Sequence, residues 1–415
     1  MSVLPSVADA ASSPATPIGM PVSARIEESA SRSSWIRRMS EEANRQRELY
    51  GVDCVFDFTL GNPNIEPPAE FHAVLEDLLL SQTSGLHGYM PNAGYLESRQ
   101  AVAEYLSVEQ GVDIPAGNVV MTCGAAGGLN VVFRTILDPG DEVVVSQPCF
   151  VEYGFYVDNH GGVLRPVRTT EDFGLDLEAI EAAIGPKTRA VLINSPNNPT
   201  GRVYSDESLE SLGKLLAKAS RAAGRIIYLV SDEPYRRIVY DGVQVPSVFG
   251  VYGNTIVTSS YSKELSLAGE RIGYLAANPA ISDVPRLMDG LIFANRVLGF
   301  VNAPALMQRA VARLQGVPVD LALYERNRRV LFGALQEAGY SVPSPQGAFY
   351  LFPRSPIDND IAFVTELAKR RVLAVPGVGF GLPGYFRLSY CVGPQVVDGA
   401  LPALRSLGAK YLTGS

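Results

Sequence analysis

A single lysine stands among small hydroxyl residues directly after a short apolar run. The run at 255–258 is typical of a buried strand, and Ser260, Ser262 and Lys263 follow it. A lysine amine can form a Schiff base with a carbonyl group, which would explain a basic residue at this position. Arg271 lies shortly after it and offers a planar fork of donors for a phosphate. Together these groups predict a site for a phosphorylated carbonyl cofactor, with pyridoxal phosphate as the candidate.

Residues suited to the same cofactor follow four other predicted strands. Gly124, Phe150, Asn198 and Asp232 each lie just after an apolar run, as Lys263 does. Ligands of open α/β sheets bind beyond the carboxyl ends of the strands, and a glycine-rich turn at a helix start can bind an anion. Each residue also has a structural interpretation by itself, such as packing for the aromatic or a helix cap for the acid. The shared position of all five favours one binding site.

The motifs around these residues resemble those of class I/II aminotransferases, in the aspartate aminotransferase superfamily of fold type I. They are Ser-x-Ser-Lys at 260–263 with Gly-x-Arg-x-Gly at 269–273, Asn-Pro-Thr-Gly at 198–201 and Asp-x-x-Tyr at 232–235. The resemblance covers nearly the whole chain from about residue 22, and the motifs occur in the order of the family. It implies pyridoxal phosphate as the cofactor and a homodimer with shared active sites. The implied reaction is amino-group transfer between an L-amino acid and a 2-oxo acid.

The resemblance also implies a role for each residue of the site. Lys263 binds the cofactor covalently and moves the α-proton of the substrate. Asp232 pairs with the ring nitrogen, while Tyr235 and Asn198 hydrogen-bond the ring oxygen. The residues expected to hold the phosphate or stack on the ring are Gly124, Ala125, Ala126, Phe150, Ser260, Arg271 and Tyr89 of the partner subunit. Those expected to bind the substrate carboxylate are Gly61, Asn198 and Arg387.

The order of apolar and helical patterns predicts an α/β protein. We expect a large domain with a mostly parallel seven-stranded sheet between helices, and a smaller α/β domain. After Gly273 the chain is expected to leave the large sheet. The expected organisation is a flexible tail at 1–22, an N-terminal helix and strand of the small domain at 23–60, a large cofactor-binding domain at 61–305, and a C-terminal small domain at 306–415.

The composition and net charge of the sequence argue against several classes of function. The 415 residues carry a net charge of −8, which argues against a nucleic-acid-binding surface. The three histidines lie far apart and the four cysteines form no Cys-x-x-Cys pair, so no metal site is expected and a cytoplasmic protein with reduced thiols is indicated. No apolar run is long enough to span a membrane. The glycine-rich turn at 124–128 lacks the Gly-x-Gly-x-x-Gly pattern of nicotinamide-binding proteins.

The substrate stays open at this stage. A dicarboxylate donor such as aspartate needs a second cation, but Ala126 stands where one subgroup of the family has a lysine. Arg296 lies near the place where another subgroup uses an arginine of the partner subunit. Aromatic and aliphatic donors are equally open. Two alternative functions remain: a carbon–sulfur β-lyase with the same residues, and a non-catalytic ligand-sensing protein, against which the filled catalytic positions argue.

Overall fold

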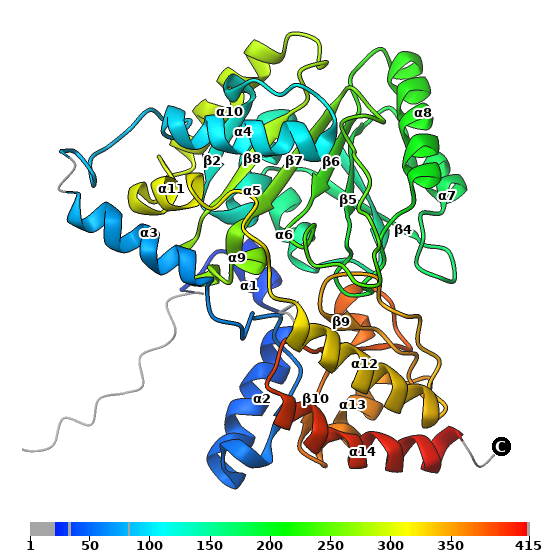
Figure 1. The fold of residues 1–415 in the computed structure, drawn as a ribbon. Coiled ribbons are helices and arrows are strands. Elements are labelled where there is room, and N and C mark those ends of the chain that lie inside the picture. The colour runs from blue at the N-terminus through cyan, green and yellow to red at the C-terminus, as the bar shows by residue number, and fades with distance from the viewer. Residues whose placement is uncertain (1–20, 32–34, 82–83, 413–415) are drawn as a thin grey trace, which may run out of the picture. The chain divides into compact units, whose positions relative to one another are not determined.

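The computed structural model, drawn as a ribbon in Figure 1, divides into two units, residues 1–34 and 35–415. The structure describes residues 21–31, 35–81 and 84–412. Most of the expected tail at 1–22 therefore lies outside the described residues, as do positions 32–34 of the expected N-terminal helix. The first unit contains α1 (Ala24–Ser31), and the second opens with α2 (Trp35–Tyr50).

Seven strands of the second unit form one sheet, in the order β2-β8-β7-β6-β5-β3-β4. All neighbours among β7, β6, β5, β3 and β4 are parallel, whereas β8 is antiparallel to both β2 and β7. This arrangement confirms the predicted α/β fold with a mostly parallel seven-stranded sheet. The strands are β2 (Val119–Thr122), β3 (Glu142–Gln147), β4 (Val163–Arg168), β5 (Thr188–Asn194), β6 (Tyr228–Asp232), β7 (Thr255–Ser260) and β8 (Gly273–Ala277).

The expectation that the chain leaves this sheet after Gly273 is wrong. The residues from Gly273 form β8, which lies between β2 and β7 and is buried along its whole length. A strand that is buried on both faces shows no alternation of apolar and polar residues, so its pattern is hard to distinguish in the sequence. Glycine is required at 273, because a side chain there would collide with backbone atoms of Ser259 and Gly124.

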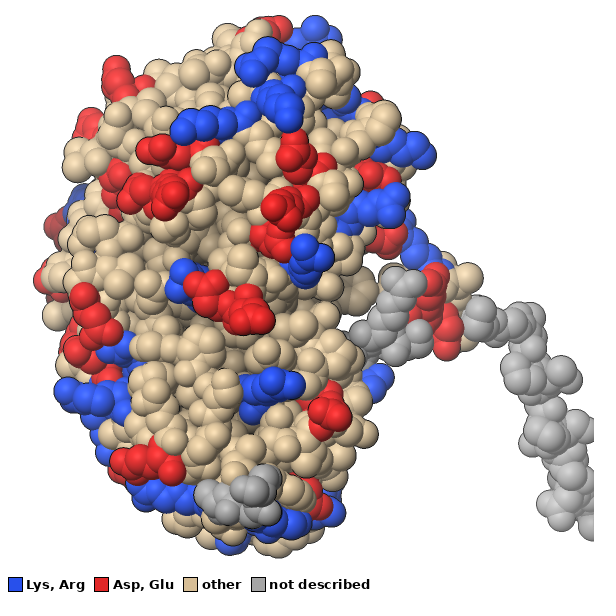
Figure 2. All heavy atoms as spheres, turned by 90° about the vertical axis from the view of Figure 1, so that its right-hand side faces the viewer, with Lys and Arg blue, Asp and Glu red and all other residues tan. Residues whose placement is uncertain are grey.

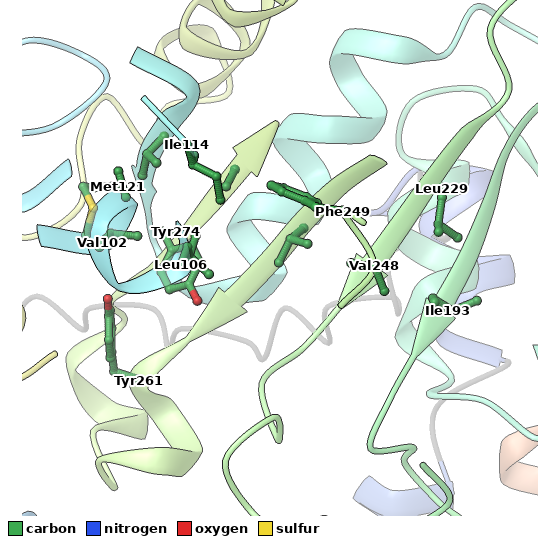
Figure 3. Close-up of a cluster of buried hydrophobic side chains, with 14 of the residues drawn as sticks. Val102, Leu106, Ile114, Met121, Ile193, Leu229, Val248, Phe249, Tyr261 and Tyr274 are labelled. Atoms are coloured by element: carbon green, nitrogen blue, oxygen red, sulfur yellow. The ribbon is translucent and has the colours of Figure 1, made fainter. Parts of the chain in front are cut away.

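Alternate residues of the strands pack into two cores on opposite faces of the sheet, as the period of a strand demands. In β5, Val191 and Ile193 contribute to one core, whereas Ala190 and Leu192 contribute to the other. The first core includes α4 (Leu96–Gln110) and α8 (Asp206–Ala223), and Figure 3 shows part of it. The second includes α5 (Gly124–Ile136), α6 (Glu152–Asp158) and α10 (Val284–Val297). Because helices cover both faces, ligands can reach this sheet at the ends of its strands.

A separate core joins the start of the second unit to its C-terminal part. Here β1 (Phe56–Asp57), the strand expected at the end of the segment 23–60, pairs in parallel with β10 (Val372–Leu373). A second small sheet has the order β11-β12-β9 and is antiparallel. The domain boundaries expected at 60/61 and 305/306 stay a prediction. The remaining elements of this part are β9 (Tyr350–Leu351), β11 (Val375–Pro376), β12 (Phe386–Ser389), α12 (Ala322–Glu337), α13 (Asp360–Ala368) and α14 (Pro394–Leu412).

Four further helices complete the second unit: α3 (Ala69–Leu80), α7 (Leu177–Ala183), α9 (Tyr261–Glu264) and α11 (Ala305–Ala312). Among the helices that the structure describes, none has both the length and the apolar character needed to cross a membrane. On the face drawn in Figure 2, acidic and basic side chains are interspersed. That face therefore carries no large field of one sign.

Candidate active site

A cavity of about 330 Å³ opens where β5, β6 and β7 end, so the predicted site residues meet there. Asp232 and Ser260 are the last residues of β6 and β7, and Lys263 follows in α9. Eleven of the thirteen predicted residues line the cavity: Gly61, Ala125, Ala126, Phe150, Asn198, Asp232, Tyr235, Ser260, Lys263, Arg271 and Arg387. Segments far apart in the sequence thus supply one chemically coherent site.

The amine of Lys263 lies in this cavity with a single short contact to the backbone. Its Nζ donates a hydrogen bond to the carbonyl oxygen of Gly61 over 2.6 Å. Burial lowers the pKa of Lys263 from 10.5 to about 8, because the charged form loses its hydration. A substantial fraction of neutral amine is therefore present near physiological pH, as a nucleophile or base requires. Position 61 must be glycine, since a Cβ atom there would collide with Oη of Tyr350.

Asp232 is a buried carboxylate whose partners are hydroxyl groups. Oη of Tyr153 donates to its Oδ2 over 2.6 Å, and Oγ1 of Thr258 lies 3.5 Å from its Oδ1. Within the described residues no cation forms an ion pair with it. Burial raises its pKa from 3.8 to about 7, because the hydrogen bonds from Tyr153 and Thr258 offset only part of the lost hydration of the charge. A cationic ring nitrogen would supply the missing charge, so Asp232 fits the pyridine ring of the expected cofactor.

Arg387 is a buried cation held from several sides. Its side chain is 1% exposed, and its Cζ lies 4.6 Å and 4.7 Å from the ring centroids of Tyr350 and Phe380. Nη1 donates to Oδ1 of Asn198 over 2.9 Å, and Nη2 donates to the carbonyl oxygen of Thr59 over 2.6 Å. Nε is buried and has no hydrogen-bond partner among the described residues. A buried donor without a partner is costly, so this guanidinium is suited to a carboxylate ligand.

The loop after β5 is fastened to the strand that carries Asp232. Asn194 accepts a hydrogen bond from the backbone N–H of Asn198 through Oδ1, and donates to the carbonyl oxygen of Asp232 through Nδ2. The phenol of Tyr235 shares a 2.8 Å hydrogen bond with the phenol of Tyr350. The amide and the phenol that are expected to contact the ring oxygen are therefore both held in place by neighbours.

The phosphate end of the cavity is built on the first turn of α5. This helix begins at Gly124, whereas the sequence pattern predicts a turn at 122–128 and a helix from Leu129 to Leu137, so the predicted start is wrong. Gly124 has φ +72°, and a Cβ atom there would lie 3.0 Å from Nη2 of Arg271. Among the described residues no side chain caps this helix, and Ala125 and Ala126 of its first turn line the cavity together with Ser260 and Arg271. The free N–H groups of such a turn are suited to bind an anion. The residues present therefore fit pyridoxal phosphate at its phosphate, its ring and its carbonyl.

Two of the predicted residues do not line the cavity. Gly124 lies next to the guanidinium of Arg271. Tyr89 is 95% exposed and borders a separate hollow together with residues 300–303 and 305. Arg296, the candidate for a second carboxylate, is exposed on α10 with its guanidinium 5.3 Å from the ring centroid of Phe293. The roles of Tyr89 and Arg296 toward a second chain stay predictions.

Several residues of the cavity were not singled out in the sequence. Tyr153 follows Phe150 by one helical turn, and this spacing could have identified it. Tyr350 lies in β9, next to the strand that carries Arg387, but nothing local marks it. Ile36 reaches the cavity from the first turn of α2.

Comparisons with known proteins point to the same chemistry. A family profile described as aminotransferase class I and II matches residues 55–404. A probable aspartate aminotransferase of Methanocaldococcus jannaschii is 30% identical over 372 residues, which cover 87% of this chain and 96% of the relative. An aromatic-amino-acid aminotransferase 2 of Thermococcus litoralis is 31% identical over 370 residues, or 86% and 92% of the two chains. The crystal structure of an amino transferase from Eubacterium rectale has a TM-score of 0.92 and 40% identity, and covers 95% of this chain and 100% of that one.

Proposed function

We propose that this chain moves the α-amino group of an L-amino acid to a 2-oxo acid in the cavity around Lys263. The chain belongs to the aminotransferase class I and II family and is a pyridoxal phosphate-dependent aminotransferase. The observation that carries the proposal is the state of Arg387. It is buried against two aromatic rings in the cavity that also contains the Lys263 amine, and its Nε has no hydrogen-bond partner among the described residues. Such a cation fits the α-carboxylate that amino acids and 2-oxo acids share.

The residues of the cavity divide the work of the reaction. Pyridoxal phosphate supplies the carbonyl carbon that takes up the amino group, and a ring that accepts the electron pair released with the α-proton. Nζ of Lys263 removes this proton and returns it, because its lowered pKa provides a neutral amine. Asp232 pairs with the ring nitrogen and keeps it positively charged. Ser260 and Arg271 hold the phosphate together with the N-terminus of α5.

Asn198 links the substrate end of the site to the cofactor end. Its Oδ1 accepts the hydrogen bond from Arg387, which leaves Nδ2 to donate toward the ring oxygen. Tyr235 reaches the same region, and its hydroxyl is oriented by Tyr350. Arg387 thus fixes the α-carboxylate of the substrate relative to Lys263, while Asn198 and Tyr235 fix the cofactor ring.

The cationic residues of the cavity restrict which amino acid can serve as the amino-group donor. Among its described lining residues, three are cations, Lys263, Arg271 and Arg387, and the proposal gives each a role. A donor with a second carboxylate would need a further cation, for which Arg296 of the partner subunit is the candidate. We therefore expect Arg296→Ala to slow the reaction of aspartate selectively, while donors with neutral side chains are unaffected. If the natural protein and Arg296→Ala reacted with aspartate at equal rates, Arg296 would have no part in binding the second carboxylate.

We also propose a homodimer. Apolar side chains are exposed on α3, on the loop before α4, at the first residue of α4 and on α10. The loop is joined to α10 by the hydrogen bond from Nδ2 of Asn295 to the carbonyl oxygen of Asn92. The exposed residues are Leu79, Leu80, Tyr89, Leu96, Phe293 and Val297. Exposed apolar surface of this kind favours association with a second copy.

Chain mixing tests the sharing of sites. Lys263→Ala and Tyr89→Ala chains are each expected to be impaired alone. A mixed dimer would contain one site with an intact Lys263 and the partner's Tyr89, so mixing should restore activity. If mixing restores nothing although sedimentation shows mixed dimers, Tyr89 does not serve the neighbouring site.

A half-reaction screen tests the main proposal. Each common amino acid is added singly to the protein with its cofactor, and the visible absorption of the cofactor is followed. Loss of the band that a 2-oxo acid reverses, without release of ammonia, supports amino transfer and identifies the donor class. A band that persists while ammonia and a 2-oxo acid accumulate would instead indicate a β-lyase.

A further inference from the structure

We propose that Tyr153 is a positioning residue that holds the two groups facing the cofactor ring. The hydroxyl of Tyr153 holds Asp232, and its ring holds Phe150 through an edge-to-face contact. The inference rests on the proposed function for the identity of the ring. The contacts of Tyr153 themselves are independent of any ligand. Tyr153 lies in the first turn of α6 and lines the cavity.

The hydroxyl of Tyr153 has a fixed direction. Its side chain is 1% exposed, and its Oη donates to Oδ2 of Asp232 over 2.6 Å. Burial and then the charge of Asp232 raise the pKa of Tyr153 well above 10. The phenol therefore remains a donor across the working range of pH, and it stabilises the ionised form of the carboxylate.

The two oxygens of Asp232 consequently have different tasks. Oδ2 is bound by Tyr153 at short distance, whereas the contact of Oδ1 to Oγ1 of Thr258 is long at 3.5 Å. Short hydrogen bonds to an ionised acceptor are the strong ones. Oδ1 is thus the oxygen left for the ring nitrogen, and Tyr153 fixes the rotation of the carboxylate that presents it.

The ring of Tyr153 contacts the predicted stacking residue. The centroids of Phe150 and Tyr153 are 5.6 Å apart, and their planes meet at 87°, which is the edge-to-face arrangement that aromatic pairs prefer. Phe150 is partly exposed in the cavity, so this contact limits its rotation. Tyr153 thereby holds both Phe150, which faces the plane of the cofactor ring, and Asp232, which faces the ring nitrogen.

Other titratable groups also influence the pKa values of Asp232 and Tyr153, and a pH test must take them into account. Glu233 raises the pKa of Asp232 through its charge, while Thr258 hydrogen-bonds the carboxylate. Tyr235, Tyr156 and Cys149 also interact electrostatically with Asp232 or Tyr153. A comparison of variants at each pH cancels these shared contributions.

The test compares the unfolding of the full chain without added cofactor, in urea, for the natural protein and for Tyr153→Phe. This change keeps the ring next to Phe150 and removes only the hydroxyl. At about pH 5 Asp232 is protonated, so the unfolding constant should rise roughly threefold; at about pH 9 it is ionised, and the rise should reach ten- to a hundredfold. In an Asp232→Asn background this dependence on pH should disappear.

Two controls accompany this test. Tyr252→Phe removes another buried phenol, which donates to the carbonyl oxygen of Ile227 over 2.9 Å, and its effect should not depend on pH. Thr258→Val removes the long contact to Oδ1 and should have a smaller effect than Tyr153→Phe at about pH 9. A Tyr153→Phe effect that is equal at both pH values, or unchanged by Asp232→Asn, would overturn the proposal.

The affinity for pyridoxal phosphate gives a second measurement. Tyr153→Phe should raise the dissociation constant roughly tenfold or more, whereas Tyr252→Phe should leave it unchanged. An unchanged dissociation constant would refute the positioning role even if the unfolding data agreed. If no variant and not even the natural protein bound the cofactor, the proposed function would fail, while the coupling of Tyr153 to Asp232 would still be decided by the unfolding data.

Discussion

Replacing Arg387 by lysine tests the carboxylate site most directly. Lysine keeps the positive charge but offers a single point of contact in place of a planar fork. In the structure the fork already holds Asn198 and Thr59 through Nη1 and Nη2, and it is stacked between Tyr350 and Phe380. One ammonium group cannot keep these contacts and also bind a carboxylate at two points.

The size of the effect follows from the bonds that are lost. A hydrogen bond to a charged group contributes about 1.5–3 kcal/mol, so losing one or two of them removes about 2–5 kcal/mol. With a tenfold change for each 1.4 kcal/mol, kcat/KM for amino acids should fall by about 30-fold to several thousandfold. The rate should fall most for the step in which the α-proton is moved, because a misplaced substrate also presents its α-proton to Lys263 in the wrong orientation.

The assay compares two substrates that differ only in the α-carboxylate. The rate constant of the half-reaction is measured for the fastest amino acid and for the corresponding decarboxylated amine. Arg387→Lys should lower the rate for the amino acid and leave the slow rate for the amine nearly unchanged, so the ratio collapses. A ratio equal to that of the natural protein would refute the assignment of Arg387.

Arg328 provides a matched control. It is also a buried arginine stacked on an aromatic ring, with its Cζ 4.6 Å from the ring centroid of Tyr240 and its Nε without a partner. It binds Asp241 and does not line the cavity. Arg328→Lys should lower stability but keep the ratio of the two rates, which separates a general packing defect from loss of carboxylate binding.

Three further outcomes are expected. The lowered pKa of Lys263 means that its neutral form grows as the pH rises through about 8, so stopped-flow capture of the cofactor should accelerate up to that pH and level off above it; a rate that is flat between about pH 6 and 10 would contradict this. Asp232→Asn should keep cofactor binding measurable by dialysis, but slow proton removal by roughly a hundredfold or more in single-turnover kinetics; an unaltered rate would exclude pairing with the ring nitrogen. Gly61→Ala should force Tyr350 to move and lower both the melting temperature and kcat/KM, and an unaffected variant would show that the collision is relieved freely.

The sequence was informative where function depends on the ends of strands. Lys263, Asp232 and Asn198 each follow an apolar run, and the parallel sheet brings such positions to one edge whatever the details of packing. The alternation of strands and helices likewise predicted the fold class. The start of α5 was misplaced, because glycines at 124, 127 and 128 look like a turn although they form the first helical turns.

The missed residues share a physical reason. Tyr153 acts on Asp232 across 79 positions of the chain, and Tyr350 acts on Tyr235 across 115. Buried aromatic residues with a polar end are common, and only the packing of α6 and β9 shows which hydroxyl reaches a functional group. Local patterns therefore identify the groups that react, but not those that orient them.

The segment after β1 shows how widely the site depends on the fold. The carbonyl oxygen of Thr59 accepts from Arg387, and that of Gly61 accepts from Lys263. Both carbonyls follow a two-residue strand that pairs with β10, outside the seven-stranded sheet. The position of the two main cations thus depends on the core around β1, which meets the cavity through Tyr235 and Tyr350. Substitutions in that core that shift β1 should impair catalysis and substrate binding together, without touching any residue that contacts the substrate.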